Sequence, residues 1–221
     1  MYNTHLIPTH PLTFDAMDNT FNLQHFWSQG DGFSHFTALL LLLMSVLSWG
    51  VILLRLSMYL RLRQMPKGLA AFWHNKDTDT RIAALAPFDK EQLITPLAQL
   101  ADSQTDTPTL ERKLAHAVRL ANNQLDKGLT LLATVASSAP FVGLLGTVWG
   151  IYRTLTSVAA QGQLDIANII GPVGEALIMT AAGLAVALPA LFAYNFFSRN
   201  NQSHQTEIDA FAHDILNSHA G

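Results

Sequence analysis

Three long apolar runs, separated by polar segments, dominate the pattern of this sequence. Residues 32–54 and 128–152 contain no Asp, Glu, Lys or Arg, and residues 166–198 contain one such residue, Glu175. About 20 apolar residues are enough to cross the hydrocarbon core of a bilayer as one helix. The pattern therefore predicts an all-α integral membrane protein with three transmembrane helices.

The polar segment 59–107 is expected to form short helices. Pro66, Pro87 and Pro96 divide it, because proline lacks a backbone donor and interrupts a helix. Small apolar groups at helical spacing lie between the prolines and predict a helical hairpin packed on something larger. These groups are Leu69, Phe72 and Trp73; Ile82, Ala83, Leu85 and Ala86; and Leu93, Leu97 and Leu100.

The second and third spans are expected to continue far beyond the membrane. Thr107 followed by Pro108 is typical of a helix start, and apolar residues then recur at helical spacing up to position 125. Nothing interrupts this pattern before the second apolar run, so one helix of roughly 70 Å is predicted over 108–157. After the third run, one apolar helical face predicts a further amphipathic helix. That face consists of Ile208, Phe211, Ala212, Ile215 and Leu216.

The basic residues orient the spans. Eleven of the 13 Lys and Arg residues lie between positions 55 and 127, and none precedes position 55. Because basic residues collect on the cytoplasmic side of membrane helices, the N-terminus is expected outside and the polar segment inside. A content of 49% hydrophobic and 13% charged residues, with a mean hydropathy of +0.22, fits a membrane protein with a soluble portion.

These observations divide the chain into seven predicted segments. They are an outside tail or interfacial helix (1–31), the first span (32–58), a cytoplasmic helical region (59–107), the long helix with the second span (108–157), an outside loop (158–168), the third span (169–198) and a cytoplasmic C-terminal helix (199–221).

Glu175 is the candidate functional residue of the third run. A carboxylate inside a membrane helix costs roughly 2.5–3.5 kcal/mol on insertion scales, so its presence indicates a use. In such surroundings a carboxylate can carry a proton near neutral pH. The alternative interpretation is that Glu175 lies close enough to the outer interface to be hydrated and idle.

Small and hydroxylated residues mark the faces where the second and third spans are expected to pack. Steps of four, three and four residues place Gly143, Thr147, Gly150 and Thr154 on one face. Gly146 and Gly150 form a GxxxG pair, and the third span is rich in small residues, among them Gly171, Gly174 and Gly183. The hydroxyl-bearing face either packs against protein or borders a path for water. Thr180 lies about 140° from Glu175 around an ideal helix, so the two do not share a narrow stripe.

Other chemistry finds little support in the sequence. Without cysteine, neither a disulfide nor a Cys-ligated metal can form, and no HExxH, P-loop or Ser/His/Asp arrangement is evident. We therefore expect no enzyme activity, no cofactor, no metal site and no nucleic-acid partner. One glutamate and a few threonines are too sparse for a proton relay across a membrane. Several copies, or a partner that brings another carboxylate, are needed.

Two motifs resemble the ExbB/TolQ family, to which the flagellar stator MotA is related. Residues 139–151 read APFVGLLGTVWGI, and residues 171–180 read GPVGEALIMT, followed by Ala181, Gly183, Pro189, Tyr194 and Asn195. The similarity is close over about 110–199, and the three-span arrangement matches over the whole chain. The N-terminal extension and the segment 209–214 resemble ExbB more than TolQ.

The resemblance implies a Gram-negative inner-membrane complex in which five such chains surround transmembrane helices of ExbD. This complex uses the proton-motive force to energise TonB, which opens outer-membrane importers for iron-siderophores and vitamin B12. Thr147 and Thr180 then match the pore-lining threonines of the family, and Glu175 matches its membrane glutamate. Two alternatives stay open: a TolQ-like subunit for envelope maintenance, and a passive scaffold around a partner's channel helices.

Overall fold

The structure, a computed structural model, describes residues 31–74, 77–101, 103, 105–161 and 167–220. The predicted N-terminal tail therefore lies outside the described residues except for its last position. Residues 162–166 of the predicted periplasmic loop 158–168 also lie outside them, and the remaining residues of that loop are helical. The regular elements in the described ranges are all helices. They are α2 (Gly32–Leu62), α3 (Met65–His74), α4 (Thr78–Leu85), α5 (Thr95–Ala98), α6 (Thr107–Asp126), α7 (Leu129–Gln161) and α8 (Ala167–Ala220).

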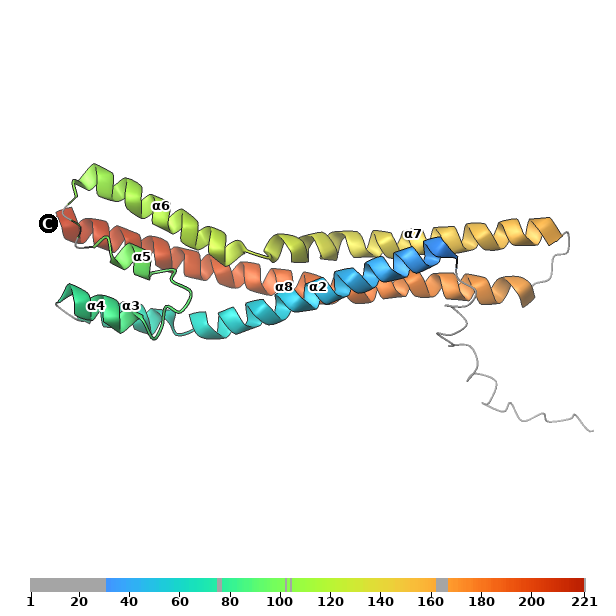
Figure 1. The fold of residues 1–221 in the computed structure, drawn as a ribbon, viewed down its shortest axis with the longest axis horizontal. Coiled ribbons are helices and arrows are strands. Elements are labelled where there is room, and N and C mark those ends of the chain that lie inside the picture. The colour runs from blue at the N-terminus through green and yellow to red at the C-terminus, as the bar shows by residue number, and fades with distance from the viewer. Residues whose placement is uncertain (1–30, 75–76, 102, 104, 162–166, 221) are drawn as a thin grey trace, which may run out of the picture.

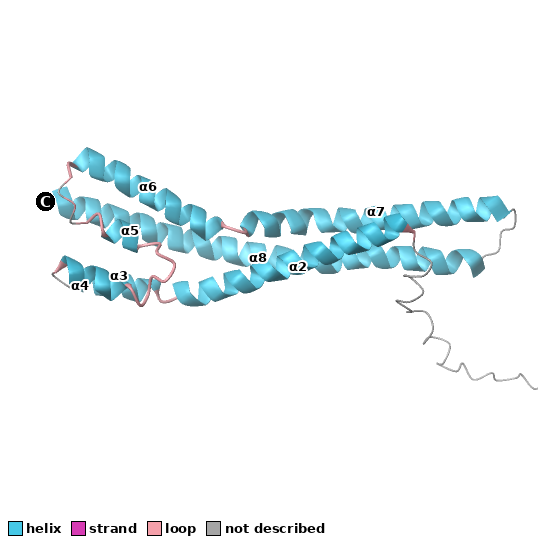
Figure 2. Cartoon of the chain, viewed as in Figure 1, coloured by secondary structure: helices cyan, strands magenta, loops and turns pink. Residues whose placement is uncertain are grey.

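The molecule is elongated, and its three long apolar helices confirm the predicted spans (Figure 1). α7 and α8 lie side by side and antiparallel, and α2 crosses both of them obliquely (Figure 2). Each of the three is long and apolar enough to cross a membrane. Large apolar side chains such as Val46, Leu54, Phe141 and Phe192 are exposed on them, as expected for surfaces that face lipid or other chains.

The helix predicted over 108–157 is interrupted. α6 ends at Asp126 and α7 begins at Leu129, and Gly128 has a φ of +79°, which a helix does not allow. The side chain of Asn201 on α8 donates to the carbonyl of Leu125, which the interruption leaves without a helical partner. The interruption turns α6 away from the line of α7, as Figure 1 shows.

The short helices gather at one end of the molecule in a unit that we call the head, formed by 65–126 and 200–220. Its core contains part of each face predicted from the sequence, including Phe72, Leu85 and Leu97, whereas Trp73, Ala83 and Ala86 of those faces are exposed. Phe72 of α3 packs edge-on against Phe211 of α8, with ring centroids 5.1 Å apart. Ile208 and Ile215 of α8 are fully buried in the same core. The predicted amphipathic continuation of the third span is thus confirmed, as one uninterrupted helix of 54 residues.

The loop before α5 is fixed by a buried carboxylate. Asp89 accepts hydrogen bonds from the backbone amides of Leu93, Ile94 and Thr95 at 2.6–2.9 Å, and from the Thr95 hydroxyl at 2.7 Å. These bonds satisfy the amides at the start of a four-residue helix that is too short to be stable alone. They hold Leu97 in the head core.

Candidate functional site

The contact between α7 and α8 is closest at two glycines, Gly143 and Gly183. A Cβ added to Gly143 would lie 2.6 Å from the carbonyl oxygen of Met179, and one added to Gly183 would lie 2.7 Å from that of Ala139. Because these neighbours are backbone atoms, no side chain fits between the helices here. We call this line of contact the seam.

The seam continues toward the end of the spans that lies away from the head, which we call the distal end. Added Cβ atoms would lie 3.1 Å from the Met179 side chain at Gly146 and 2.8 Å from the Ala176 Cβ at Gly150. Gly171 and Gly174 differ, since nothing in the described chain lies within 4 Å of such an atom. Helix packing at these two positions, expected from the sequence, is not found within a single chain.

The two candidate threonines meet across the seam. Thr180 donates a hydrogen bond of 3.4 Å to the hydroxyl of Thr147, which in turn donates to the carbonyl of Leu144 at 2.7 Å. Thr147 is only 5% exposed, and Thr154 on the same face donates to its own helix at Gly150. Within one chain, this face of α7 packs against α8.

Glu175 lies in a separate cavity of about 220 Å³ between α2, α7 and α8. Its walls combine small residues with polar side chains. They are formed by Ser34, Gly146, Gly150, Arg153, Thr154, Ser157, Pro172, Glu175, Ala176 and Met179. Glu175 is half-buried, so the helices around the cavity enclose much of its side chain.

The cavity and the threonine pair lie on opposite edges of the seam. On an ideal helix the residues of α8 that face α7, Ala176, Met179 and Gly183, lie between Glu175 and Thr180. Thr147 and Thr180 are not among the residues that line the cavity. The angle of about 140° expected from the sequence therefore separates the two features in the folded chain.

Asp31, directly before the first apolar run, caps the N-terminus of α2, and the first turn of α2 contributes Ser34 to the cavity. One carboxylate oxygen accepts from the amide and hydroxyl of Ser34 at 3.0 and 2.7 Å, and the other accepts from the indole of Trp149 at 2.6 Å. Phe33 stacks on Trp149 with centroids 4.6 Å apart. This arrangement, which we call the clamp, fastens the first turn of α2 to α7.

The charge of Asp31 is maintained by its partners. Burial alone would raise the pKa of this carboxyl, but the hydrogen bonds from Ser34 and Trp149 and the nearby guanidinium of Arg153 lower the pKa to about 2. The sequence reasoning missed this residue. The available signal was an Asp at the start of an apolar helix, where it serves as an N-cap.

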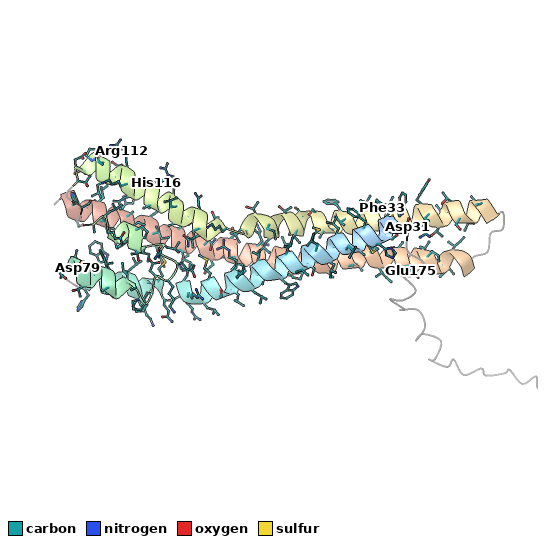
Figure 3. The ribbon with its side chains drawn as sticks, in the orientation of Figure 1. Asp31, Phe33, Asp79, Arg112, His116 and Glu175 are labelled. Carbon is teal, nitrogen blue, oxygen red and sulfur yellow. The ribbon has the colours of Figure 1, made fainter. Side chains whose placement is uncertain are left out.

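The site lies about one hydrocarbon thickness from the head. Arg55 of α2 packs beside Gly128, and Asp31 lies 24 residues before Arg55, about 36 Å along a helix. The hydrocarbon core of a bilayer is about 30 Å thick. Figure 3 shows Asp31, Phe33 and Glu175 together, far from Arg112 and His116 of the head. Glu175 thus lies near the distal end of the spans rather than at their middle. No group of three potential metal ligands occurs in the described ranges.

A family model for the MotA/TolQ/ExbB proton channel family matches residues 82–210. The chain belongs to this family. The matched residues include the seam, the threonine pair and Glu175, and they extend through most of α8.

Relatives of the same family match most of the chain. A biopolymer transport protein ExbB of Xanthomonas campestris pv. campestris is 40% identical over 194 residues, covering 79% of this chain and 77% of the relative. One from Neisseria meningitidis serogroup A is 37% identical over 215 residues, covering 88% and 95%. A Tol-Pal system protein TolQ of Pseudomonas aeruginosa is 41% identical over 101 residues, which is 44% of each chain.

Membership makes the chain an all-α integral membrane protein of a proton-channel family, in agreement with its three apolar helices. The family is one of membrane channels and transport proteins rather than of enzymes.

Proposed function

We propose that this chain is the ExbB-type subunit of an inner-membrane complex that uses the proton-motive force to energise import across the outer membrane. The observation that carries the proposal is the position of Glu175, a carboxylate in a polar cavity between three membrane helices of a proton-channel family member. The ExbB relatives, matched over most of their length, support this role over the TolQ role. The partners are an ExbD-like subunit and a TonB-like protein.

The orientation follows from the charges. Of the 13 Lys and Arg residues, all except Arg153 lie in the head or at the adjoining ends of the spans, so the head lies in the cytoplasm together with the C-terminus. The distal end then faces the periplasm, and Glu175 receives protons from that side. A proton that crosses with a potential of 100 mV releases about 2.3 kcal/mol.

A continuous path for protons needs more than one chain. Glu175 and the pair Thr147 and Thr180 lie on opposite edges of the seam. Within a single chain, these residues therefore do not line the same path. In a ring of copies, which we take to be a pentamer, both edges border neighbouring chains or a central lumen. Gly171 and Gly174, where an added Cβ would meet nothing within 4 Å in the described residues, then suit contact with another helix.

The test replaces Glu175 by Gln and by Ala in cells that express the full complex, and measures energy-dependent uptake of iron-siderophore and vitamin B12. We expect uptake to fall at least tenfold, with normal amounts of assembled complex. The matched control is Asp209→Asn, a carboxylate on the exposed surface of the same helix, and it should leave uptake unchanged.

The outcomes separate the alternatives. Normal uptake at normal abundance of the Glu175→Gln complex would show that Glu175 has no part in energy transduction. Loss of uptake together with loss of assembly would favour a passive scaffold around a partner's helices. If the intact gene restores detergent resistance but not siderophore uptake in suitable deletion strains, the TolQ-like role is correct.

A further inference from the structure

The head contains a hollow of about 770 Å³ between α6 and the segment that includes α5, larger than the cavity at Glu175. We call this hollow the groove. Leu93 and Leu100 contribute to its apolar lining. The basic side chains of the lining, Arg112, Lys113 and His116, all come from α6. The groove therefore combines an apolar surface with positive charge.

The two walls of the groove are joined by fixed contacts. Gln124 of α6 donates a hydrogen bond of 2.9 Å to the carbonyl of Glu91 on the opposite wall. The carboxylate of Glu91 pairs with Arg61 of α2 at 3.0 Å. The next residue, Gln92, has a φ of +54°, which is strained for a residue with a Cβ and persists only where the surroundings hold the backbone. The groove is thus present in the folded chain before any occupant binds.

The described residues place no carboxylate in ion-pair contact with Arg112 or Lys113. Arg112 donates to the hydroxyl of Thr109 at 3.2 Å, and Lys113 donates to that of Thr105 at 3.4 Å. An occupant that brings carboxylates would therefore meet cations that can pair with it. A lipid headgroup does not reach them, because Arg112 lies 14 positions before the end of α6, about 21 Å along the helix.

The other side of the head carries an exposed aromatic side chain beside carboxylates. Trp73 of α3 is 39% exposed and packs against Phe211 of α8, with ring centroids 6.0 Å apart. Next to Phe211, steps of three and four residues place Glu207, Ala210 and Asp214 on one face of α8. Ala210 and Asp214 are exposed, and Glu207 is partly exposed. We call Trp73 together with this face the acidic edge.

The groove and the acidic edge lie on different sides of α8. α6 lies on one side of α8, and α3 and α4 lie on the other, as Figure 1 shows. Gln205 of α8 reaches the carboxylate of Asp126 on α6 at 3.5 Å, and Ala210 lies about 140° from Gln205 around an ideal helix. A single chain therefore cannot bring its own acidic edge into its own groove, whereas a second copy can.

The two surfaces also lie at the same level along the molecule. The antiparallel register of α8 and α6 is fixed by hydrogen bonds from α8 to backbone carbonyls of α6: Asn201 to Leu125, and His219 to Thr105 at 3.0 Å. In this register Asp214 lies at about the level of Arg112, and Ala210 at about that of His116. Copies that cross the same bilayer side by side present equal levels to one another, so the acidic edge of one copy meets the groove of the next.

We propose that the groove of each head receives Trp73 and the acidic edge of the head of a neighbouring copy. Trp73 lies against the apolar lining, and Asp214 pairs with Arg112 and Lys113. Each copy then uses two different surfaces, and such a contact closes into a ring when it repeats around an axis. A tryptophan anchor in a pocket with charges around it is typical of strong protein contacts. The inference rests on the proposed function, which supplies the ring of copies.

The chain contains no cysteine, so introduced cysteines can report this contact in the full-length protein in lipid vesicles. Ala117→Cys places a thiol in the groove, and Ala210→Cys places one on the acidic edge. Under mild oxidation the double variant should form disulfides between copies, with dimers, trimers and larger species up to the closed ring on denaturing gels. Each single variant should stay monomeric, because equivalent residues do not meet in a contact between two different surfaces.

Exchange of charges tests the partners in the double-cysteine background. Arg112→Glu and Asp214→Arg should each slow disulfide formation by about fivefold or more, because each brings like charges together. The two substitutions combined should restore most of the original rate. Asp209→Arg is the matched control and should leave the rate unchanged, since Asp209 is exposed on the same helix about 140° from Asp214.

Replacement of the tryptophan tests the anchor. Trp73→Ala should slow disulfide formation by a similar factor, and Trp73→Phe should slow it less because an aromatic ring remains. Trp49→Ala removes a tryptophan that is 52% exposed on α2, away from the head, and should not change the rate.

Absence of linked copies in the double-cysteine variant would overturn the proposal, and so would combined charge substitutions that fail to restore the rate. Uptake measurements on Glu175→Gln keep the two hypotheses apart. If the copies link as expected but uptake persists without Glu175, the contact between heads is correct and the proposed function is wrong. If uptake is lost but the copies do not link, the proposed function stands and the contact between heads falls.

Discussion

The closeness of the seam leads to a quantitative expectation for Gly183→Ala. The new methyl would lie 2.7 Å from the carbonyl oxygen of Ala139, whereas ordinary contact begins near 3.4 Å. α7 and α8 must therefore separate by about 0.7 Å, the difference between these two distances. Overpacking of this kind typically costs about 1–3 kcal/mol. The same separation would break the 3.4 Å hydrogen bond between Thr147 and Thr180.

Gly174→Ala on the same helix is the matched control. Both substitutions gain up to about 1 kcal/mol of helix propensity, so this gain cancels when the two variants are compared. Nothing in the described chain lies within 4 Å of a Cβ at Gly174. We therefore expect the unfolding free energy of Gly183→Ala to be about 1–3 kcal/mol lower than that of Gly174→Ala.

The assay is reversible unfolding of the purified protein in mixed micelles, followed by far-UV circular dichroism as the fraction of SDS increases. The mass of each oligomer in mild detergent is measured in parallel, because Gly174 is exposed to other chains and its substitution can alter assembly. Equal stability of Gly183→Ala and Gly174→Ala would refute the reasoning. The double variant Gly143→Ala/Gly183→Ala should cost less than the sum of its parts, since one separation accommodates both methyls.

Three further expectations concern the interruption at Gly128, the head and the clamp. Gly128→Ala should lower the unfolding free energy by about 1–2 kcal/mol, because a φ of +79° is strained for residues with a Cβ, and Gly128→Asn should cost less in the same assay. Phe211→Ala should cost about 3–5 kcal/mol and make the head sensitive to limited proteolysis, whereas Leu120→Ala on its surface should do neither. The lowered pKa of Asp31 contributes stability that is complete above about pH 4 and is lost as pH falls toward 2. The near-UV dichroism of Trp149 should follow this loss, and in Asp31→Asn it should not change over that interval.

The spans and the head core could be predicted because their signals are local and periodic. The apolar runs exceed the length of a membrane helix, and Ile208, Phe211 and Ile215 recur at helical spacing where α8 enters the head. The interruption after α6 could not be predicted in this way. A single Gly128 inside a helical pattern costs only about 1 kcal/mol. What stabilises the break is Asn201, 76 positions after the carbonyl that it binds.

The same distinction applies to the site. Glu175 was recognisable because a lone charge in an apolar run is costly and therefore conspicuous. Asp31 was not, since its partner Trp149 lies 118 positions away, and in the sequence it is the last residue of a polar tail. The contact of Asp31 with Trp149 depends on the position along α7 at which α2 crosses it, and no local sequence pattern specifies that position.

The arrangement of the long helices suggests how the site and the head communicate. α8 runs without interruption from Glu175 to Ile215 in the centre of the head core, while α7 is separated from α6 at Gly128. Since backbone atoms meet at the seam, α7 and α8 cannot slide past one another without a change in their separation. A displacement at the Glu175 cavity is therefore expected to reach the head through α8, with Pro189, which cannot donate a backbone hydrogen bond, as the weakest point of that connection. The seam and the continuous α8 thus connect the Glu175 cavity with the head, whereas α7 reaches the head only through the interruption at Gly128.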